Sequence, residues 1–207
     1  MAAVTWNPAD KDANIVLSNG NLTATGGSGT LFNGVRATRF ASAGKLYSEY
    51  VIVADSATVG SNGSWAVGNS ISSGPLTSII LGSAASQWGY YPWSGLFYIA
   101  GTVSFIQADQ TNGHVVQVAI DLGGKLIWVK TQASNWNNSA PANPATGTGG
   151  ASIAAMTAGA LAPTWAAGGS AVVTANFGAS AFAFSVPAGF SAWGDNPSSR
   201  ARLLLGV

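Results

Sequence analysis

The chain has 207 residues, of which 7% are charged, and its formal net charge at pH 7 is +1. An average soluble protein carries about 25% charged residues, so the solubility of this chain must depend on neutral polar side chains. The eight basic residues are scattered along the sequence and form no cluster of the kind that binds nucleic acid or an anionic membrane surface. We therefore expect neither of these partners.

The residues that the chain lacks narrow the classes of protein further. It has no cysteine, which removes disulfides, thiolate metal sites and a cysteine nucleophile. The N-terminal stretch MAAVTWNPADKDANIV has no basic start and no uninterrupted apolar run, so we expect no secretory signal peptide. No run approaches the 18 apolar residues of a transmembrane helix, so we expect no membrane insertion.

The organisation of the chain predicts one domain over residues 1–207, because no linker of low hydrophobicity divides it. We expect the core to span about residues 6–193. The short C-terminal tail, residues 195–207, contains two Arg and three Leu after a Pro. It is a last strand, a docking peptide or a disordered end.

Short runs with β-strand composition recur along the chain, separated by turn residues. In chain order they are residues 14–19, 22–25, 35–41, 45–54, 65–70, 77–83, 96–107, 115–122, 125–130, 170–178 and 181–187. This spacing, with little helical periodicity, predicts an all-β fold, an antiparallel two-sheet β-sandwich with at most one or two short helical segments. The eight Trp, eight Phe and five Tyr are enough to fill the space between two sheets. The Ala-rich run 149–163 forms either one short helix or a loop.

The stretch NGHVVQVAIDLGGKLIWVK, residues 112–130, predicts a β-hairpin. Gly123 and Gly124 separate its two strands, and a two-residue glycine loop supplies the positive φ angles of a tight turn. If Leu122 faces Lys125 across this turn, alternation places five apolar side chains on one core face. They belong to Val116, Val118, Ile120, Ile127 and Val129.

The opposite face of this hairpin mixes polar and aromatic side chains. They belong to Gln117, Ala119, Asp121, Leu126, Trp128 and Lys130. This face is too polar for the middle of a dry core and too aromatic for a surface that meets only water. We expect it to be half covered, with the Ala-rich segment 149–163 as the candidate cover, and we assign ligand binding to the loops.

Four segments of this chain, taken in order, are similar to the motifs of one known family. They are AGKLYSEYVIV (43–53), WGYY (88–91), GHVVQVAIDLGGKLIWVK (113–130) and NFGASAFAFSVPAGFSAW (176–193). In that order they resemble the G-K-x-Y-x-E-V strand, the S-x-G-Y segment, the G-D-V-V-G-V-x-L-D-L hairpin and the closing N-F-G-x-x-x-F-x-x-x-x-P-x-G-F of SPRY domains. That family is the B30.2 group of bent, concanavalin-like β-sandwiches.

The resemblance implies a SPRY-like, concanavalin-like jelly roll and a mode of action. SPRY domains generally bind partners through loops at one end of the sandwich and are not themselves enzymes. The likeness is closer to bacterial and bacteriophage members, in which a stretch like NWNNSAPANPATGTGG follows the hairpin. His114 stands where the family usually has Asp, and the hairpin loop is one residue shorter than the usual acidic loop, so no role for an acidic loop carries over.

The stretch NWNNSAPANP, residues 135–144, is a candidate sugar-binding loop. An exposed Trp136 would stack on the apolar face of a pyranose, and the amides of Asn135, Asn137 and Asn138 would bond its hydroxyls. The alternative is that Trp136 plugs the end of the core and the asparagines supply turn conformations.

The stretch WGYYPWSG packs four aromatic side chains into eight residues around a proline. Alternation places Trp88 and Tyr90 in the core and turns Tyr91 the other way. The proline ends the strand, so Trp93 falls in the loop that follows. Tyr91 and Trp93 are therefore candidates for an aromatic recognition surface.

The sequence predicts no catalytic residue, no metal ligand and no cofactor. A glycosidase of this shape needs two carboxylates about 5–10 Å apart across a cleft, and no Asp-x-Glu or Glu-x-x-x-Glu spacing places two on one strand face. Glu49 is the only glutamate, and the resemblance places it at a family position with a structural role. Asp121 lies beside the hairpin turn. His114 is the only histidine, so neither a triad nor a transition-metal site forms around it. A calcium site in the loops stays open, because Asp, Asn and carbonyl oxygens suffice for one.

The favoured function is that of a non-catalytic recognition module of a bacteriophage or prophage particle, which binds a glycan or protein on a host cell surface. Its low charge and its Gly-, Thr- and Asn-rich composition favour this reading, and a virion-associated or extracellular location goes with it. The alternatives are a bacterial protein-interaction domain with no role in a virion and, as an outsider, a glycoside hydrolase on the same scaffold. The candidate ligand-binding residues are Tyr91, Trp93, Asn135, Trp136, Asn137 and Asn138. The sequence does not indicate the oligomeric state.

Overall fold

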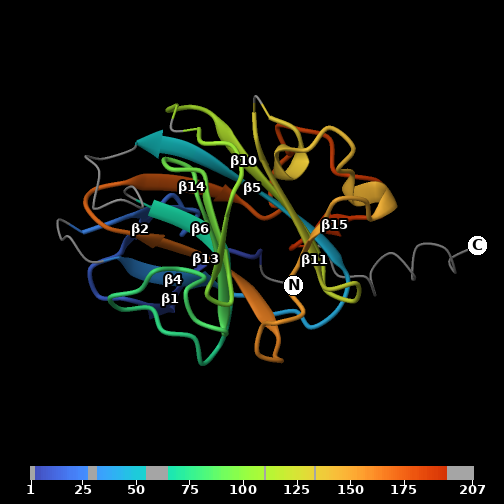
Figure 1. The fold of residues 1–207 in the computed structure, drawn as a ribbon. Helices are drawn as coiled ribbons and strands as arrows, with labels where there is room; N and C mark the ends of the chain where they lie inside the picture. Colours follow the sequence, from blue (N-terminus) through green and yellow to red (C-terminus); the bar gives the residue numbers. More distant parts are fainter. Residues whose placement is uncertain (1–2, 28–31, 55–64, 110, 133, 195–207) are drawn as a thin grey trace, which may run out of the picture.

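The computed structural model describes residues 3–27, 32–54, 65–109, 111–132 and 134–194. These residues form two β-sheets packed face to face (Figure 1). Two 3₁₀ turns are the only helical elements among them. The predicted all-β sandwich is therefore confirmed, whereas the tail 195–207 lies outside the described residues.

The first sheet has seven antiparallel strands in the order β1-β4-β13-β6-β7-β8-β9. They are β1 (Trp6–Lys11), β4 (Asn33–Ala37), β6 (Trp65–Ile71), β7 (Gln87–Tyr91), β8 (Leu96–Ile99), β9 (Thr102–Phe105) and β13 (Leu161–Ala167). The middle strands are buried on both faces, whereas every residue of the edge strand β9 is exposed. The first sheet thus ends on an uncharged edge that carries exposed Val103 and Phe105.

The second sheet runs in the order β12-β11-β10-β5-β14-β3-β2, and β15 lies parallel beside β5. Its strands are β2 (Val16–Ser18), β3 (Thr23–Thr25), β5 (Lys45–Ala54), β10 (Val115–Asp121), β11 (Leu126–Thr131), β12 (Ala151–Ser152), β14 (Val172–Asn176) and β15 (Ser191–Ala192). In β5, Leu46 and Tyr50 point toward the first sheet, and Tyr47 points away from it. We call the side on which Tyr47 lies the outer face.

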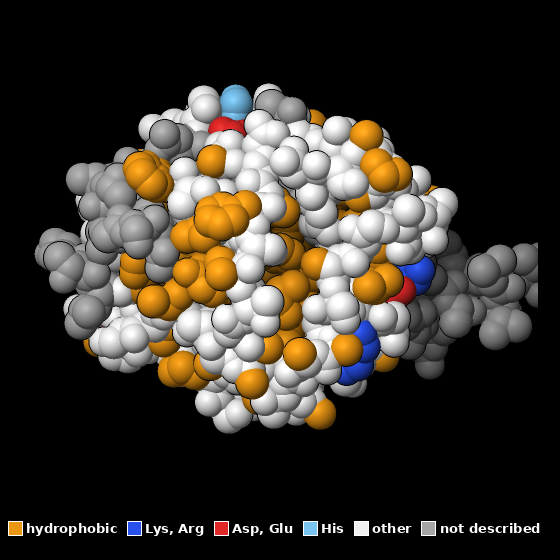
Figure 2. Space-filling view, in the orientation of Figure 1, with side chains coloured by type: hydrophobic (Ala, Val, Ile, Leu, Met, Phe, Trp, Pro, Cys, Tyr) orange, Lys and Arg blue, Asp and Glu red, His pale blue; other side chains and the backbone are white. Residues whose placement is uncertain are grey.

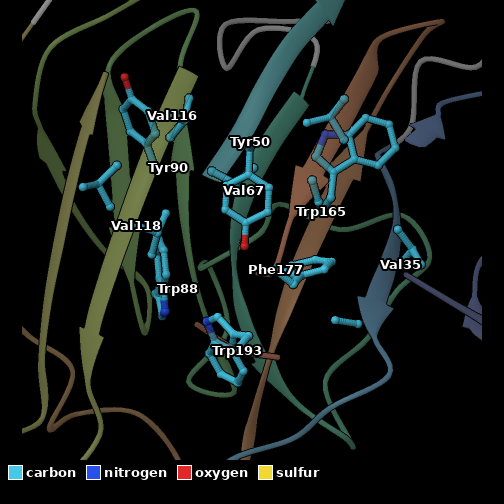
Figure 3. Packing of buried hydrophobic residues seen from close by; sticks show 14 of the residues in the cluster. Val35, Tyr50, Val67, Trp88, Tyr90, Val116, Val118, Trp165, Phe177 and Trp193 are labelled. Carbon is cyan, nitrogen blue, oxygen red and sulfur yellow. The ribbon is translucent and has the colours of Figure 1, made fainter. Parts of the chain in front are cut away.

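Large aromatic side chains fill the space between the two sheets. Figure 3 shows Tyr50, Trp88, Trp165, Phe177 and Trp193 pointing into this space. Each such side chain removes about 150–250 Å² from water, which contributes about 4–6 kcal/mol at about 25 cal/mol per Å². Six of the eight tryptophans are fully buried, so the fold itself uses most of these large rings and leaves few for recognition.

The hairpin of β10 and β11 has the predicted register but not the predicted turn. Asp121 pairs with Leu126 as expected, and the apolar face of the hairpin packs in the core. The positive φ of the loop belongs to Lys125, at 55°, and to neither glycine. The expectation that Gly123 and Gly124 supply it is wrong, because the loop has four residues, and such loops are usually built around a type I turn. Asp121 Oδ1 accepts the Gly124 N–H at 2.8 Å and closes this turn.

A strand that the sequence did not predict begins at the end of the Ala-rich run and continues beyond it, from Leu161 to Ala167. It is β13, which lies between β4 and β6 in the middle of the first sheet and includes Pro163. Leu161 exchanges both backbone hydrogen bonds with Ala41, on the β4 side. By alternation the Pro163 nitrogen faces this same side, where pairing with β4 begins only at Thr164. The gap in the ladder accommodates a residue without an N–H.

Two runs with strand composition are not strands. Residues 77–83 and 181–187 form turns and irregular structure. The closing motif contains four Phe, two of them in the run 181–187. Phe177 and Phe190 are buried, whereas Phe182 and Phe184 are half-buried. The segment that holds these last two rings packs on the outer face of the second sheet, where the candidate site lies.

Candidate functional site

The outer face of the second sheet is covered by two segments that are far apart in the sequence, residues 136–150 and 182–190. The first contains the 3₁₀ turns η2 (Trp136–Asn138) and η3 (Pro144–Thr146), and the second has no regular structure except turns. In Figure 1 they are the yellow-orange and red segments beside β11 and β15. Together they bury the outer side of the β10–β11 hairpin.

Trp128 of β11 anchors this cover. Its indole Nε1–H donates to the Thr148 carbonyl oxygen at 2.8 Å, and its ring meets the Phe190 ring edge-on at 6.2 Å. A Cβ atom on Gly150 would lie 2.6 Å from the Trp128 ring, so only glycine lets the chain pass there. The expectation that residues 149–163 form the cover is therefore wrong, because the chain leaves this face after Gly150 as β12 and then as β13.

Asn137 fastens the first segment to the edge of β11. Its Oδ1 accepts the Val129 N–H at 2.9 Å, and its Nδ2 donates to the carbonyl oxygens of Ile127 and Gly149, both at 3.0 Å. The short strand β12 pairs only with Leu126 and Ile127, so the Asn137 amide is the next hydrogen-bonding partner along β11. Both amide hydrogens of Asn137 are thus used within the protein.

Glu49 fastens the second segment to β5. The residue is 2% exposed, and its carboxylate accepts the N–H groups of Ala183 at 2.8 Å and Phe184 at 2.9 Å, and the hydroxyl of Tyr47 at 2.8 Å. Three donors compensate the burial of this charge. Burial raises the pKa of the Tyr47 hydroxyl, and the hydrogen bond to Glu49 raises it further, so Tyr47 stays a donor. Glu49 therefore has a structural role, as the family resemblance implies.

A hollow of about 400 Å³ lies between the two covering segments. Its lining consists of Gln117, Lys130, Trp136, Asn143, Ala145 and residues 184–188. Gln117 and Lys130 are direct cross-strand neighbours on β10 and β11, and both reach the hollow from the sheet. The volume falls in the range of small-molecule sites, about 300–1,000 Å³. We call this feature the outer-face hollow.

Among the described residues that line the outer-face hollow, Lys130 is the only charged one. Its Nζ lies 5.2 Å from the centroid of the Trp136 ring and 5.9 Å from that of the Phe184 ring. The negative faces of such rings attract an ammonium group by about 0.5–1 kcal/mol. In the described part of the chain, no carboxylate lies within ion-pair distance of this nitrogen. The rings therefore hold the charge in place without neutralising it.

The predicted binding residues are only partly brought together. Trp136 is half-buried and lines the outer-face hollow. Asn135 and Asn138 are exposed beside it in the sequence and do not line the hollow. Trp93 is half-buried in the turn after β7 and does not line it either. The two tryptophans thus do not share this site.

Tyr91 is not a surface residue, and the expectation that it is exposed is wrong. Its side chain points away from the space between the sheets, as alternation predicted. Ile79 and Leu81, from a run predicted as a strand, cover that side of the first sheet and bury the ring. The Tyr91 hydroxyl donates to the Leu81 carbonyl oxygen at 3.3 Å. Burial raises the pKa of this hydroxyl, and the ring has no surface to offer a ligand.

Sequence reasoning missed Gln117, Lys130, Asn143 and Phe184 as residues of one site. One signal in the sequence did indicate this site. Alternation placed Gln117 and Lys130 on a face whose mixed polar and aromatic composition fits neither the core nor a fully exposed surface. The missing information was the position of residues 182–190. That position depends on hydrogen bonds to Glu49, 134 residues or more away, which no local pattern reveals.

The carboxylates of the described residues do not form a catalytic pair on the outer face. Glu49 and Asp121 both lie there, but four residues of strand and one strand spacing separate them, which amounts to about 14 Å. A glycosidase needs about 5–10 Å. Asp121 also pairs with Lys45 at 3.3 Å. These two acids are positioned to support the fold.

The one histidine pairs with an acid in a loop. His114 Nδ1 lies 2.8 Å from an oxygen of Asp109. Burial acts to raise the pKa of Asp109, but hydrogen bonds from His114 and Thr111 outweigh it and lower this pKa below its usual value. Within the described ranges, no three His, Cys, Asp or Glu side chains gather as a metal site would require, and no helix is long and apolar enough to cross a membrane.

No family model matches this sequence, and no curated protein matches it either. Solved structures do resemble it. The SPRY domain of human HERC1 has a TM-score of 0.63 at 18% identity, with 82% of this chain and 96% of that chain covered. The chain has a SPRY-like fold.

Two other solved structures share this SPRY-like fold. The TRIM65 PSpry domain has a TM-score of 0.61 at 13% identity and covers 84% of this chain and 92% of its own. Stonustoxin has a TM-score of 0.60 at 15% identity, and the match covers 84% of this chain and 27% of the toxin chain. At these identities the likeness concerns the fold, which agrees with the SPRY resemblance of the four sequence motifs. The bacterial or bacteriophage origin stays a prediction.

Proposed function

We propose that this chain is a non-catalytic recognition module that binds a glycan in the outer-face hollow. The observation that carries the proposal is the pairing of two partly exposed rings, Trp136 and Phe184, with hydrogen-bonding side chains in one hollow. Sugars present apolar C–H faces and hydroxyl groups together, and protein sites that bind small ligands combine aromatic walls with a few polar groups in the same way.

Binding is favoured over catalysis by the chemistry of the hollow. Among the described residues its lining contains no carboxylate, histidine or cysteine, so it lacks the pair of carboxylates that glycoside hydrolysis requires. The SPRY-like fold points in the same direction, since the resemblance implies a binding module. A protein partner is the second candidate, because the fold is typical of protein-binding modules.

We place the module in a bacteriophage or prophage particle, where it would contact the surface of a host cell. The low content of charged residues supports this placement. Figure 2 shows one face of the molecule on which charged side chains are few and neutral ones dominate. A bacterial interaction domain with no role in a virion is the alternative. Genes for tail or capsid proteins beside the gene for this chain would favour the first, and their absence the second.

A glycan array that carries bacterial surface polysaccharides, probed with the full chain, tests the proposed function. We expect binding to a defined set of glycans, and each bound glycan should change the Trp fluorescence. Trp136→Ala should weaken binding by about 1–3 kcal/mol, as loss of an aromatic anchor does. Trp93→Ala is the matched control, because this half-buried tryptophan does not line the hollow.

Three results would contradict the proposed function. One is a wild-type chain that binds no glycan on the array. Another is an equal loss of binding in Trp93→Ala and Trp136→Ala, which would place the site elsewhere. The third is hydrolysis of a polysaccharide by the pure protein that disappears in Glu49→Gln or Asp121→Asn, which would make the chain an enzyme.

A further inference from the structure

We infer that the outer-face hollow accepts the carboxylate of an acidic saccharide, a uronic or sialic acid, and this inference rests on the proposed function. Lys130 receives the carboxylate, and Gln117 bonds a hydroxyl of the same sugar. Trp136 and Phe184 contact its apolar C–H groups. The chemical class is a sugar that carries both an anionic group and neutral hydroxyls.

The charge in the hollow favours an anion. Lys130 is the only charged residue in the lining, and within the described ranges no acidic side chain pairs with it. The rings of Trp136 and Phe184 hold its ammonium group in position, but a cation–π contact leaves the positive charge intact. A carboxylate would gain a charge-assisted hydrogen bond from this nitrogen, whereas a neutral sugar would leave the charge without a counterion.

The wall adds a donor to that of Lys130. Asn143 Oδ1 accepts the Ala145 N–H at 3.0 Å, so the Asn143 amide nitrogen is left to donate to a ligand at the rim. An ionised carboxylate is an acceptor with two oxygens and no hydrogen. Two donors in a hollow whose described lining has no acidic side chain suit such a group.

Gln117 supplies a contact of a different kind. The residue is 1% exposed, and one atom of its side-chain amide has no hydrogen-bond partner. The single hydrogen of the Tyr47 hydroxyl goes to Glu49, which is charged and lies at 2.8 Å, in preference to Gln117 at 3.2 Å. The Gln117 amide is therefore better placed with its N–H donating to the Tyr47 oxygen, and its own carbonyl oxygen is then the unpaired atom.

A sugar hydroxyl satisfies this amide in either orientation. A hydroxyl donates one hydrogen and accepts through two lone pairs, so it can pair with the carbonyl oxygen or with the N–H of Gln117. Gln117 lies directly across from Lys130 in the sheet, where facing residues have Cβ atoms about 5 Å apart. One sugar ring with a carboxylate and a nearby hydroxyl spans that separation.

Two other ligands that can carry negative charge, an acidic peptide and a phosphate, suit the hollow less well. Extended peptides bind sheet edges through their backbone, but at this site the Asn137 side chain already occupies the edge of β11. Phosphate is usually held by a cluster of arginines or by several backbone N–H groups. The described residues that line the hollow include one lysine and no arginine, and Glu49 takes the N–H of Phe184.

The test compares acidic saccharides with carboxyl-reduced counterparts on the full chain. The full chain is first applied to an array on which each uronic-acid or sialic-acid oligosaccharide stands beside its reduced or neutral form. For each pair with a bound member, titration then measures the dissociation constants of both members. We expect at least tenfold tighter binding of the acidic member, and weaker binding at higher salt. Lys130→Gln should abolish this preference, and Lys130→Arg should retain most of it. Lys125→Gln removes the same charge from an exposed loop and should behave like the wild type.

The outcomes separate this inference from the proposed function. If neutral glycans bind as tightly as acidic ones and Trp136→Ala weakens both, the proposed function stands and the inference is wrong. If acidic saccharides bind and Lys130→Gln retains the preference, or Lys125→Gln loses it equally, the carboxylate is not at Lys130. If no acidic saccharide binds, the inference is wrong, and if no glycan of any kind binds, the proposed function is wrong as well.

Discussion

Glu49 and Phe184 are 135 residues apart in the sequence, yet the carboxylate of the first accepts the backbone N–H of the second at 2.9 Å. A second bond, from the N–H of Ala183 at 2.8 Å, runs to the other oxygen of the same carboxylate. A side chain therefore takes the place that a neighbouring strand would have in a ladder. This pair of bonds sets the position of one wall of the outer-face hollow.

Replacing Glu49 by glutamine should destabilise the protein by about 2–4 kcal/mol, because the amide keeps one accepting oxygen, turns its NH2 group toward the other backbone N–H, and loses charge-assisted bonds. Urea denaturation measures this loss. Asp121→Asn is the matched control on the same face. Its partner Lys45 is 41% exposed, and surface ion pairs contribute about 0–1 kcal/mol. Equal stability of the two variants would show that Glu49 does not tether the segment.

Asn137 and Asn138 allow the edge tether to be measured separately from backbone strain. Both have positive φ, 47° and 53°, so alanine at either position has the same unfavourable conformation, which costs about 1–2 kcal/mol. Only Asn137 bonds the edge of β11. We expect Asn137→Ala to lose about 1–3 kcal/mol more in chemical denaturation than Asn138→Ala. Similar losses of stability in the two variants would show that the Asn137 side chain does not stabilise the edge of β11.

Lys125 should be the strained residue of the central hairpin. Its φ is 55°. Lys125→Gly should therefore raise the free energy of unfolding by about 0.5–1 kcal/mol, since glycine adopts this conformation without strain. Gly123→Ala should be nearly neutral, because this φ is not positive and the nearest atom to its new Cβ, Asp121 Oδ1, would lie at 3.5 Å. Thermal denaturation decides the matter. If Gly123→Ala lowers the free energy of unfolding by more than about 1 kcal/mol, the turn with positive φ at the two glycines, as expected from the sequence, is correct.

The stability of the fold should fall in acid partly through Asp12. Burial acts to raise the pKa of this carboxyl, but hydrogen bonds from Thr77 and Asn14 outweigh burial and lower the pKa below its ordinary value of 3.8. The unfolded chain therefore binds this proton first, so the contribution of Asp12 is complete above about pH 4 and disappears as pH falls through the lower folded pKa. The unfolding free energy of Asp12→Asn, measured between pH 2 and 7, should show a flatter slope below pH 4. Parallel curves for variant and wild type would refute this assignment.

Much of the second sheet could be predicted because its strands alternate strictly. The pattern in β10 and β11 fixed both the register and the two faces, and it placed Gln117 and Lys130 on the side where the outer-face hollow lies. Alternation also gave the correct direction for Tyr91. It could not reveal that Ile79 and Leu81 cover that side, since the run that contains them resembles a strand in composition and forms turns.

The remaining errors share a physical cause. The run AFAFSVP has alternating apolar residues, but its N–H groups bond a carboxylate instead of a strand. The strand β13 includes Pro163, which local rules read as an interruption, and it is tolerated because the neighbouring ladder has a gap at that point. In both cases a partner distant in the sequence decides the structure, and a pattern read along the chain contains no information about that partner.

The hydrogen bonds by which Asn137 and Glu49 tether the two covering segments affect how tightly a ligand is held. The floor of the outer-face hollow belongs to the second sheet, whereas its walls are irregular segments attached by a small number of bonds. Such segments open locally at a lower free energy than the sheet beneath them. An open wall leaves no binding site, so the apparent dissociation constant equals the intrinsic one divided by the fraction of molecules that are closed. Residues that never touch the ligand therefore help to set its apparent affinity, and selection can adjust that affinity by changing the tethers while the contacting residues stay the same.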